Sequence, residues 1–150
     1  MDERVRNIKT PEKCEIFAKN CADRGRDDLA LEARQWAVQL RAEAYGAESE
    51  VEKEAVSAIY AYEEVLSARN GKKTRASSTW QLIKRHGIIN AIDRALNRPA
   101  DPEGYVTLVD MGLADYALEA VILRNPETFS ESAVKISQDR IRPVTTIIAK

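Results

Sequence analysis

Apolar residues recur about every 3.6 positions along almost the whole chain, and this period limits the fold more than any other feature of the sequence. In residues 27–45 the apolar residues that share one helical face are Leu29, Ala33, Trp36, Ala37, Leu40 and Ala44. Glycines and prolines interrupt the pattern where helices of ordinary length should end. We therefore expect an all-α fold, an irregular bundle of about seven or eight helices.

Local signals place the ends of several helices. Thr10 and Pro11 are typical of an N-cap and the first residue of a helix, and Ser49 with Glu52 predicts a capping box. The first two helices should form an antiparallel hairpin. The expected helices span residues 11–24, 27–45, 50–69, 77–85, 88–97, 104–111, 113–124 and 131–141, with Ser77 or Ser78 as the cap of the fourth and Ser130 as the cap of the last.

The helix expected over residues 50–69 has an apolar side and an acidic side. The residues predicted to face the core are Ala55, Val56, Ile59, Tyr62, Val65 and Leu66. The carboxylates predicted to face solvent are Glu52, Glu54, Glu63 and Glu64. Sequence neighbours such as Glu63 and Glu64 point apart on a helix, so they are typical of a solvated surface and not of an acid–base pair.

The composition fits one globular domain. The chain has 150 residues, of which 44% are apolar and 31% charged, and this is short for two domains. A division near residues 98–103 is the alternative, because residues 99–131 contain seven acids and one base. No apolar run approaches the ~20 residues that cross a bilayer, and the start of the chain has no signal-peptide core. We therefore expect a cytoplasmic protein with no membrane partner.

Positive charge is concentrated in residues 69–98, which hold eight basic residues and one acid, a formal charge of +7 in a chain of net charge -1. Charge segregated in this way indicates an anionic partner, with nucleic acid first among the candidates. Trp80 and Ile83 should face the core, and the serines at the start of the helix offer hydroxyl and N–H groups to a phosphate. The residues predicted to bind are Lys72, Lys73, Arg75, Ser77, Ser78, Gln81, Lys84 and Arg85.

Motifs for catalysis and for metal binding are absent. The GKKT of residues 71–74 imitates the end of a phosphate-binding P-loop but lacks the earlier glycine and the preceding strand. The two cysteines and the single histidine, His86, are too few for a zinc site. We expect no catalytic residue, metal site or cofactor, and a protein that is not an enzyme. A hydrolase that uses His86 with Asp110 or Asp115 is a distant alternative.

Residues 70–89 contain the block NGKKTRAS-x-TW-x-x-IKRHGII, which resembles one found in small helical domains of uncharacterised bacterial proteins. The resemblance covers roughly residues 10–130 of this chain. It implies a bacterial origin, and it supplies neither an activity nor catalytic residues nor a substrate.

The basic segment and the absence of catalytic motifs together predict a non-enzymatic protein that binds nucleic acid or another polyanion through the loop and helix of residues 72–85. The alternative is a protein interaction or self-associating module. In that case the basic segment docks on the acidic surfaces of residues 50–64 and 99–131, within the chain or in a dimer.

The C-terminal tail is a second candidate for self-association. After Pro143 the chain continues with five successive β-branched residues, a composition that disfavours helix and suits an extended segment. Exchange of this tail with a second copy predicts a homodimer. A groove between helices of the same chain is the competing place for it.

Overall fold

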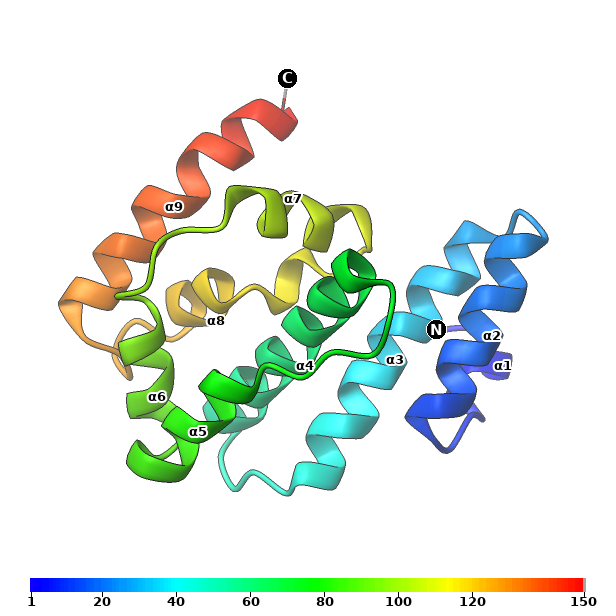
Figure 1. Ribbon diagram of the computed structural model, residues 1–150, viewed down its shortest axis with the longest axis horizontal. Helices are drawn as coiled ribbons and strands as arrows, with labels where there is room; N and C mark the ends of the chain where they lie inside the picture. The colour runs from blue at the N-terminus through cyan, green and yellow to red at the C-terminus, as the bar shows by residue number, and fades with distance from the viewer. Residues whose placement is uncertain (150) are drawn as a thin grey trace.

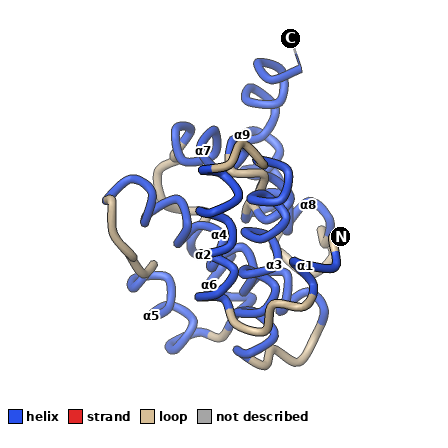
Figure 2. The backbone as a smooth tube through the Cα atoms, turned by 90° about the vertical axis from the view of Figure 1, so that its right-hand side faces the viewer, coloured by secondary structure: helices blue, strands red, loops and turns tan. Residues whose placement is uncertain are grey.

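The chain folds into a bundle of helices joined by loops (Figures 1 and 2). The computed structural model describes the backbone of residues 1–149 and the side chains of residues 1–141. This part of the chain contains no β-strand and has eight helices of seven or more residues, which confirms the all-α prediction. The elements are α1 (Glu3–Arg6), α2 (Pro11–Asp23), α3 (Asp27–Tyr45), α4 (Glu50–Asn70), α5 (Ser77–His86), α6 (Ile88–Ala95), α7 (Pro102–Asp110), the 3-10 turn η1 (Ala114–Tyr116), α8 (Leu118–Arg124) and α9 (Glu131–Ala149).

Two predicted helix starts have the expected side-chain caps. Thr10 Oγ1 accepts a hydrogen bond from the backbone N–H of Lys13 at 3.3 Å, at the start of α2. Ser49 Oγ accepts from the N–H of Glu52 at 3.1 Å, at the start of α4. The Glu52 carboxylate closes this motif by accepting from the Ser49 hydroxyl at 3.0 Å, and not from its backbone N–H as in the usual capping box.

Besides shifts of one or two residues at the ends of several helices, α6 and α7 among them, two boundary predictions before the last helix differ from the structure. Residues 113–124, expected as one helix, form η1 and α8, because Ala117 between them has the extended conformation with φ -61° and ψ 142°. The cap of α5 is Ala76, which has no side chain that could accept a hydrogen bond, and not Ser77 or Ser78. Contacts distant in sequence, described below, take the place of that local cap.

The last helix is longer than predicted. Ser130 Oγ accepts from the backbone N–H of Ala133 at 3.1 Å, as the capping signal indicates. Helix α9 is bounded at Ala149, whereas the prediction ended it near Ile141 and made residues 143–150 an extended tail. The β-branched composition was a poor guide to this backbone, because strand propensity depends on neighbours to pack against. The side chains from residue 142 onward lie outside the described residues, and so does the predicted pairing of two tails.

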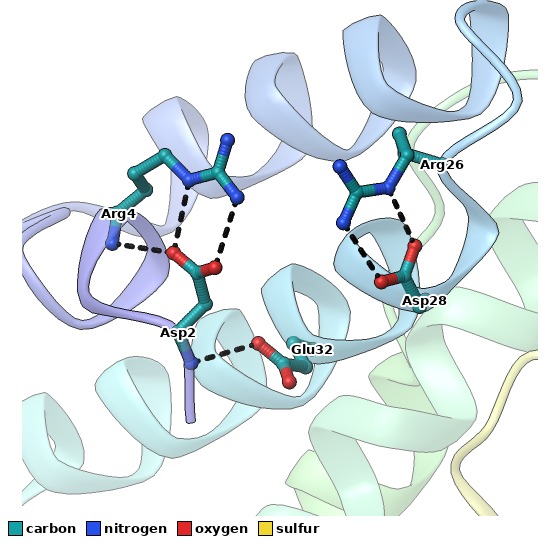
Figure 3. A network of polar contacts seen from close by, with 5 residues as sticks. All are labelled: Asp2, Arg4, Arg26, Asp28 and Glu32. Carbon is teal, nitrogen blue, oxygen red and sulfur yellow. Dashed lines mark hydrogen bonds and ion pairs between the residues drawn. The ribbon is translucent and has the colours of Figure 1, made fainter.

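The first helices form the predicted hairpin, with α2 beside α3 (Figure 1) and α1 in contact with α3. Figure 3 shows how polar groups fasten the N-terminus: the backbone N–H of Asp2 donates to Glu32 Oε2 at 3.0 Å, while Arg4 pairs with the Asp2 carboxylate. These hydrogen bonds from Arg4 lower the pKa of Asp2 from 3.8 to about 2. Arg26 and Asp28 form a separate ion pair at the start of α3.

The inner stripe predicted for α3 is confirmed in its first part. Leu29, Ala33 and Ala37 are buried, and Trp36 is half-buried. Ala44, also predicted to face inward, is exposed. With 19 residues α3 extends beyond the 13 residues of α2, so its last turn has no partner in the hairpin.

Helix α4 lies at the centre of the bundle, where it contacts α3, α6, α7, α8 and η1 (Figure 1). Its buried residue Ile59 belongs to one apolar cluster with Ile92 of α6 and Ile122 of α8. Val65, two turns further along α4, belongs to another cluster with Leu108 of α7. Because α4 packs against elements on both sides of the loop between α6 and α7, we keep the interpretation of one domain.

We expect Gly112→Ala to destabilise the protein more than Gly25→Ala does. Both glycines have positive φ, +75° and +76°, so both substitutions carry the left-handed penalty of about 1–2 kcal/mol. A Cβ on Gly112 would also lie 2.5 Å from Leu31 Cδ2 and 3.3 Å from Leu31 Cβ, whereas one on Gly25 meets nothing within 4 Å. In Gly112→Ala, overpacking against Leu31 should add about 1 kcal/mol or more to the loss of unfolding free energy, as measured by urea unfolding. Equal losses would show that Leu31 moves aside freely.

Candidate nucleic-acid interface

One side of α5 is exposed and carries most of the side chains predicted to bind. At about 100° per residue, five of them fall within an arc of roughly 120°. Of the two residues predicted to face the core, Ile83 is 8% exposed and Trp80 is half-buried. Thr79, which was not part of that prediction, is 7% exposed. The orientation of α5 therefore agrees with the prediction at Ile83 and in part at Trp80. We call the exposed group the α5 face; its members are Ser77, Ser78, Gln81, Lys84 and Arg85.

The basic residues of the segment divide into two groups. Arg69 pairs with Asp101 and Arg75 with Glu63, each at 2.8 Å. The hydrogen bond from Arg69 holds the pKa of Asp101 below its usual value of 3.8. The other group is exposed and forms no ion pair with a carboxylate in the part of the chain whose side chains are described; its members are Lys72, Lys73, Lys84, Arg85, Arg94 and Arg98.

Glu63 on α4 is the main residue that the sequence analysis placed wrongly. It was expected on an exposed acidic surface, but it is only 8% exposed. Its Oε2 atom accepts three hydrogen bonds: from Arg75 Nε at 2.8 Å, from the backbone N–H of Ala76 at 2.9 Å and from Trp80 Nε1 at 2.6 Å. This carboxylate therefore ties the loop before α5, and the first turn of α5, to the central helix.

The helical period contained the signal for this burial. Glu63 follows Ile59 by four residues and Val56 by seven, and both of those side chains are fully buried. Positions four and seven apart share one helical face. Glu63 thus lies on the core side of α4, and its charge alone suggested solvent exposure.

Arg75 and Trp80 form a partly exposed cluster around this carboxylate. The Arg75 guanidinium lies 5.5 Å from the centroid of the Trp80 ring, a cation–π distance. The rings of Tyr45 and Tyr60 lie 5.6 and 5.1 Å from Trp80. Among the predicted basic binding residues, Arg75 is the one that pairs with a carboxylate in the described part of the chain.

The start of α5 does not present the open phosphate site that its serines suggested. The N–H of the cap residue Ala76 already donates to Glu63. Ser78 Oγ accepts a hydrogen bond from Arg98 Nη1 at 3.1 Å. Its neighbour Ser77 is exposed. An anion that approached this end of α5 would meet Arg98 and the serine hydroxyls, while the carboxylate of Glu63 already uses part of the positive end of the helix.

A polar hollow of about 240 Å³ lies beside the loop between α4 and α5. Lys73 lines it together with Glu15, Glu63 and Glu64. Arg41 lines the hollow as well and pairs with both Glu15 and Glu64, in the latter case at 2.7 Å. Lys73 therefore lies in a mixed surface of carboxylates and arginines, unlike Lys84 and Arg85 on the α5 face.

Comparisons with known proteins supply no relative for this chain. No family model matches it, and no curated protein and no solved structure is significantly similar. The resemblance of residues 70–89 to bacterial helical domains stays a prediction, as does the cytoplasmic location. Among the described residues, no helix has the length and apolar character needed to span a membrane, and no group of three or more His, Cys, Asp and Glu side chains could hold a metal ion.

We expect Glu63→Gln to lower the free energy of unfolding by about 1.5–3 kcal/mol, because the neutral amide oxygen accepts weaker hydrogen bonds than the carboxylate and the ion pair with Arg75 is lost. Glu48→Gln is the matched control, since Glu48 is exposed. Trp80→Phe removes the indole N–H and keeps a large aromatic ring. Each single variant removes the Glu63–Trp80 hydrogen bond. The variant that carries both substitutions should therefore lose less unfolding free energy than the sum of the two single losses, as measured by urea unfolding. Strict additivity would contradict the contact.

Proposed function

We propose that this protein binds nucleic acid through the α5 face, without catalysing a reaction. The single observation that supports this best is that Lys84 and Arg85 are adjacent and exposed and have no carboxylate partner among the described side chains. Two neighbouring cations without counterions attract the phosphate backbone of a nucleic acid over several ångströms in water.

Part of the basic segment docks within the chain, since Arg75 pairs with Glu63 and Arg69 with Asp101. Glu54 and Glu64 of α4 pair with arginines outside the segment, Arg124 at 2.8 Å and Arg41 at 2.7 Å. Docking within the chain therefore accounts for Arg69 and Arg75 but leaves Lys84 and Arg85 without a carboxylate partner among the described side chains. Docking on a separate acidic protein is tested together with nucleic acid below.

The chemistry of the α5 face favours contacts to the sugar–phosphate backbone. Lys84 is a point charge with three donors, Arg85 can donate two parallel hydrogen bonds to one phosphate, and Gln81 and the serines add neutral donors. Such contacts position a strand and carry no base sequence information. The proposed binding is therefore of modest affinity and strongly dependent on salt.

We expect binding to short DNA or RNA strands at 50 mM salt, measured by fluorescence anisotropy, to weaken about 100-fold at 200 mM if about four phosphates are contacted. Lys84→Glu with Arg85→Glu should abolish it. Lys13→Glu with Lys19→Glu on α2 makes the same change in net charge at two other exposed positions and should leave most of the binding intact.

Circular dichroism of both double variants should match that of the parent, because all four side chains are exposed. Loss of helical signal in the α5 variant would show that Lys84 and Arg85 serve internal contacts. Equal losses in the α5 and α2 variants would show that only net charge matters. Competition by poly-glutamate as strong as that by DNA would favour an acidic protein as the partner.

A further inference from the structure

A second cavity, of about 160 Å³, opens between α4, α6, α7 and α8. Three aromatic side chains line it: Tyr62 of α4, Tyr105 of α7 and Tyr116 of η1. Small residues, among them Ala95 and Ala117, leave the space between the rings open. A cavity of ~150 Å³ with apolar walls holds a benzene molecule, so this one has room for a single six-membered ring.

The rim of this cavity is polar and not fully occupied. Tyr116 Oη accepts from Gln39 Nε2 at 3.0 Å, whereas no hydrogen bond to the hydroxyls of Tyr62 and Tyr105 is found among the described side chains. Glu119 lines the cavity, and its contact with Arg140 is long, at 3.8 Å. An aromatic ring that carries hydrogen-bonding groups could therefore find partners at its edge and tyrosine rings at its faces.

Arg98 connects this cavity to the α5 face. It lines the cavity, and its Nη1 donates to Ser78 Oγ at 3.1 Å and to Thr79 Oγ1 at 3.4 Å. The carbonyl of Arg98 accepts from Arg140 Nη2 at 2.5 Å, which fixes the backbone that carries it. Since a guanidinium has five N–H donors, Arg98 can still reach a phosphate of a strand that lies on Ser78.

We propose that this cavity takes one unstacked pyrimidine base of a single strand whose backbone lies along the α5 face. The inference rests on the proposed function and narrows it from nucleic acid in general to single strands with an accessible pyrimidine. The single ring of a pyrimidine matches the cavity volume, whereas the two fused rings of a purine need more room than one such ring. Bases inside a duplex are stacked and paired, so they reach such a cavity only at an unpairing cost.

The test measures the affinity of the full chain for four 12-residue probes at 50 mM salt: dC12, dT12, dA12 and an abasic strand of the same length. Stacking of one base on aromatic side chains should make the two pyrimidine strands bind about 10-fold more tightly than the abasic strand. The strand dA12 should resemble the abasic one. A duplex of the same length should bind like the abasic strand or more weakly.

A preference for pyrimidine strands could also arise outside the cavity, for example from stacking of the bases within free dA12. Two variants that change the cavity in opposite directions test whether the cavity causes the preference. Ala95→Leu fills the cavity and should lower the affinity for dC12 and dT12 to that for the abasic strand, without changing the latter. Tyr105→Ala, at a half-buried position of α7, enlarges the cavity and should raise the affinity for dA12 relative to dC12. Thermal melting confirms that each variant is folded.

The outcomes distinguish the two proposals. If no strand binds at 50 mM salt, the proposed function and the cavity inference both fail. If all four probes bind equally, and neither variant changes their order, the α5 face binds backbone alone and the cavity inference is overturned while the function stands. An unchanged pyrimidine preference in folded Ala95→Leu also overturns it, because the base then lies elsewhere.

Discussion

Atom Oε2 of Glu63 holds the basic segment in place. It accepts a guanidinium N–H, a backbone N–H and an indole N–H, all donated by residues 75–80. A carboxylate with this little exposure is costly to bury unless charged or strong donors replace its water. The loop and the first turn of α5 supply those donors, so burial of Glu63 and the position of α5 depend on each other. The orientation of the α5 face follows from this contact and from the core packing of Ile83.

The parts of the fold that the sequence predicted well are those that depend on near neighbours in the chain. Helical period, N-caps and glycine stops act within a turn or two, and they located α2, α3 and α4 closely. The break at Ala117 has no such signal, since alanine is a strong helix former.

The difference between near and distant contacts in the chain also explains which parts of the candidate site were predicted. Side chains on the exposed side of α5 were placed correctly because one period decides their direction. The role of Arg75 was missed because its partner is 12 residues earlier on another helix, and the role of Arg98 because it meets Ser78 across 20 residues. The cavity between the tyrosines was missed altogether, since its walls come from several elements, among them α4, α7 and η1, that no local pattern brings together.

In the described ion pairs, arginine and lysine have different roles. Arginines make the contacts to partly buried carboxylates, as Arg41, Arg75 and Arg140 do, which suits a planar group with several directed donors. The lysines of the basic segment stay in solvent. The charge of the α5 face comes from Lys84 and Arg85, and contacts of such side chains to phosphates carry no base sequence information. If this protein discriminates among nucleic acids, the discrimination must therefore come from a feature beside the α5 face, and the tyrosine-lined cavity that Arg98 connects to Ser78 is the one the structure offers.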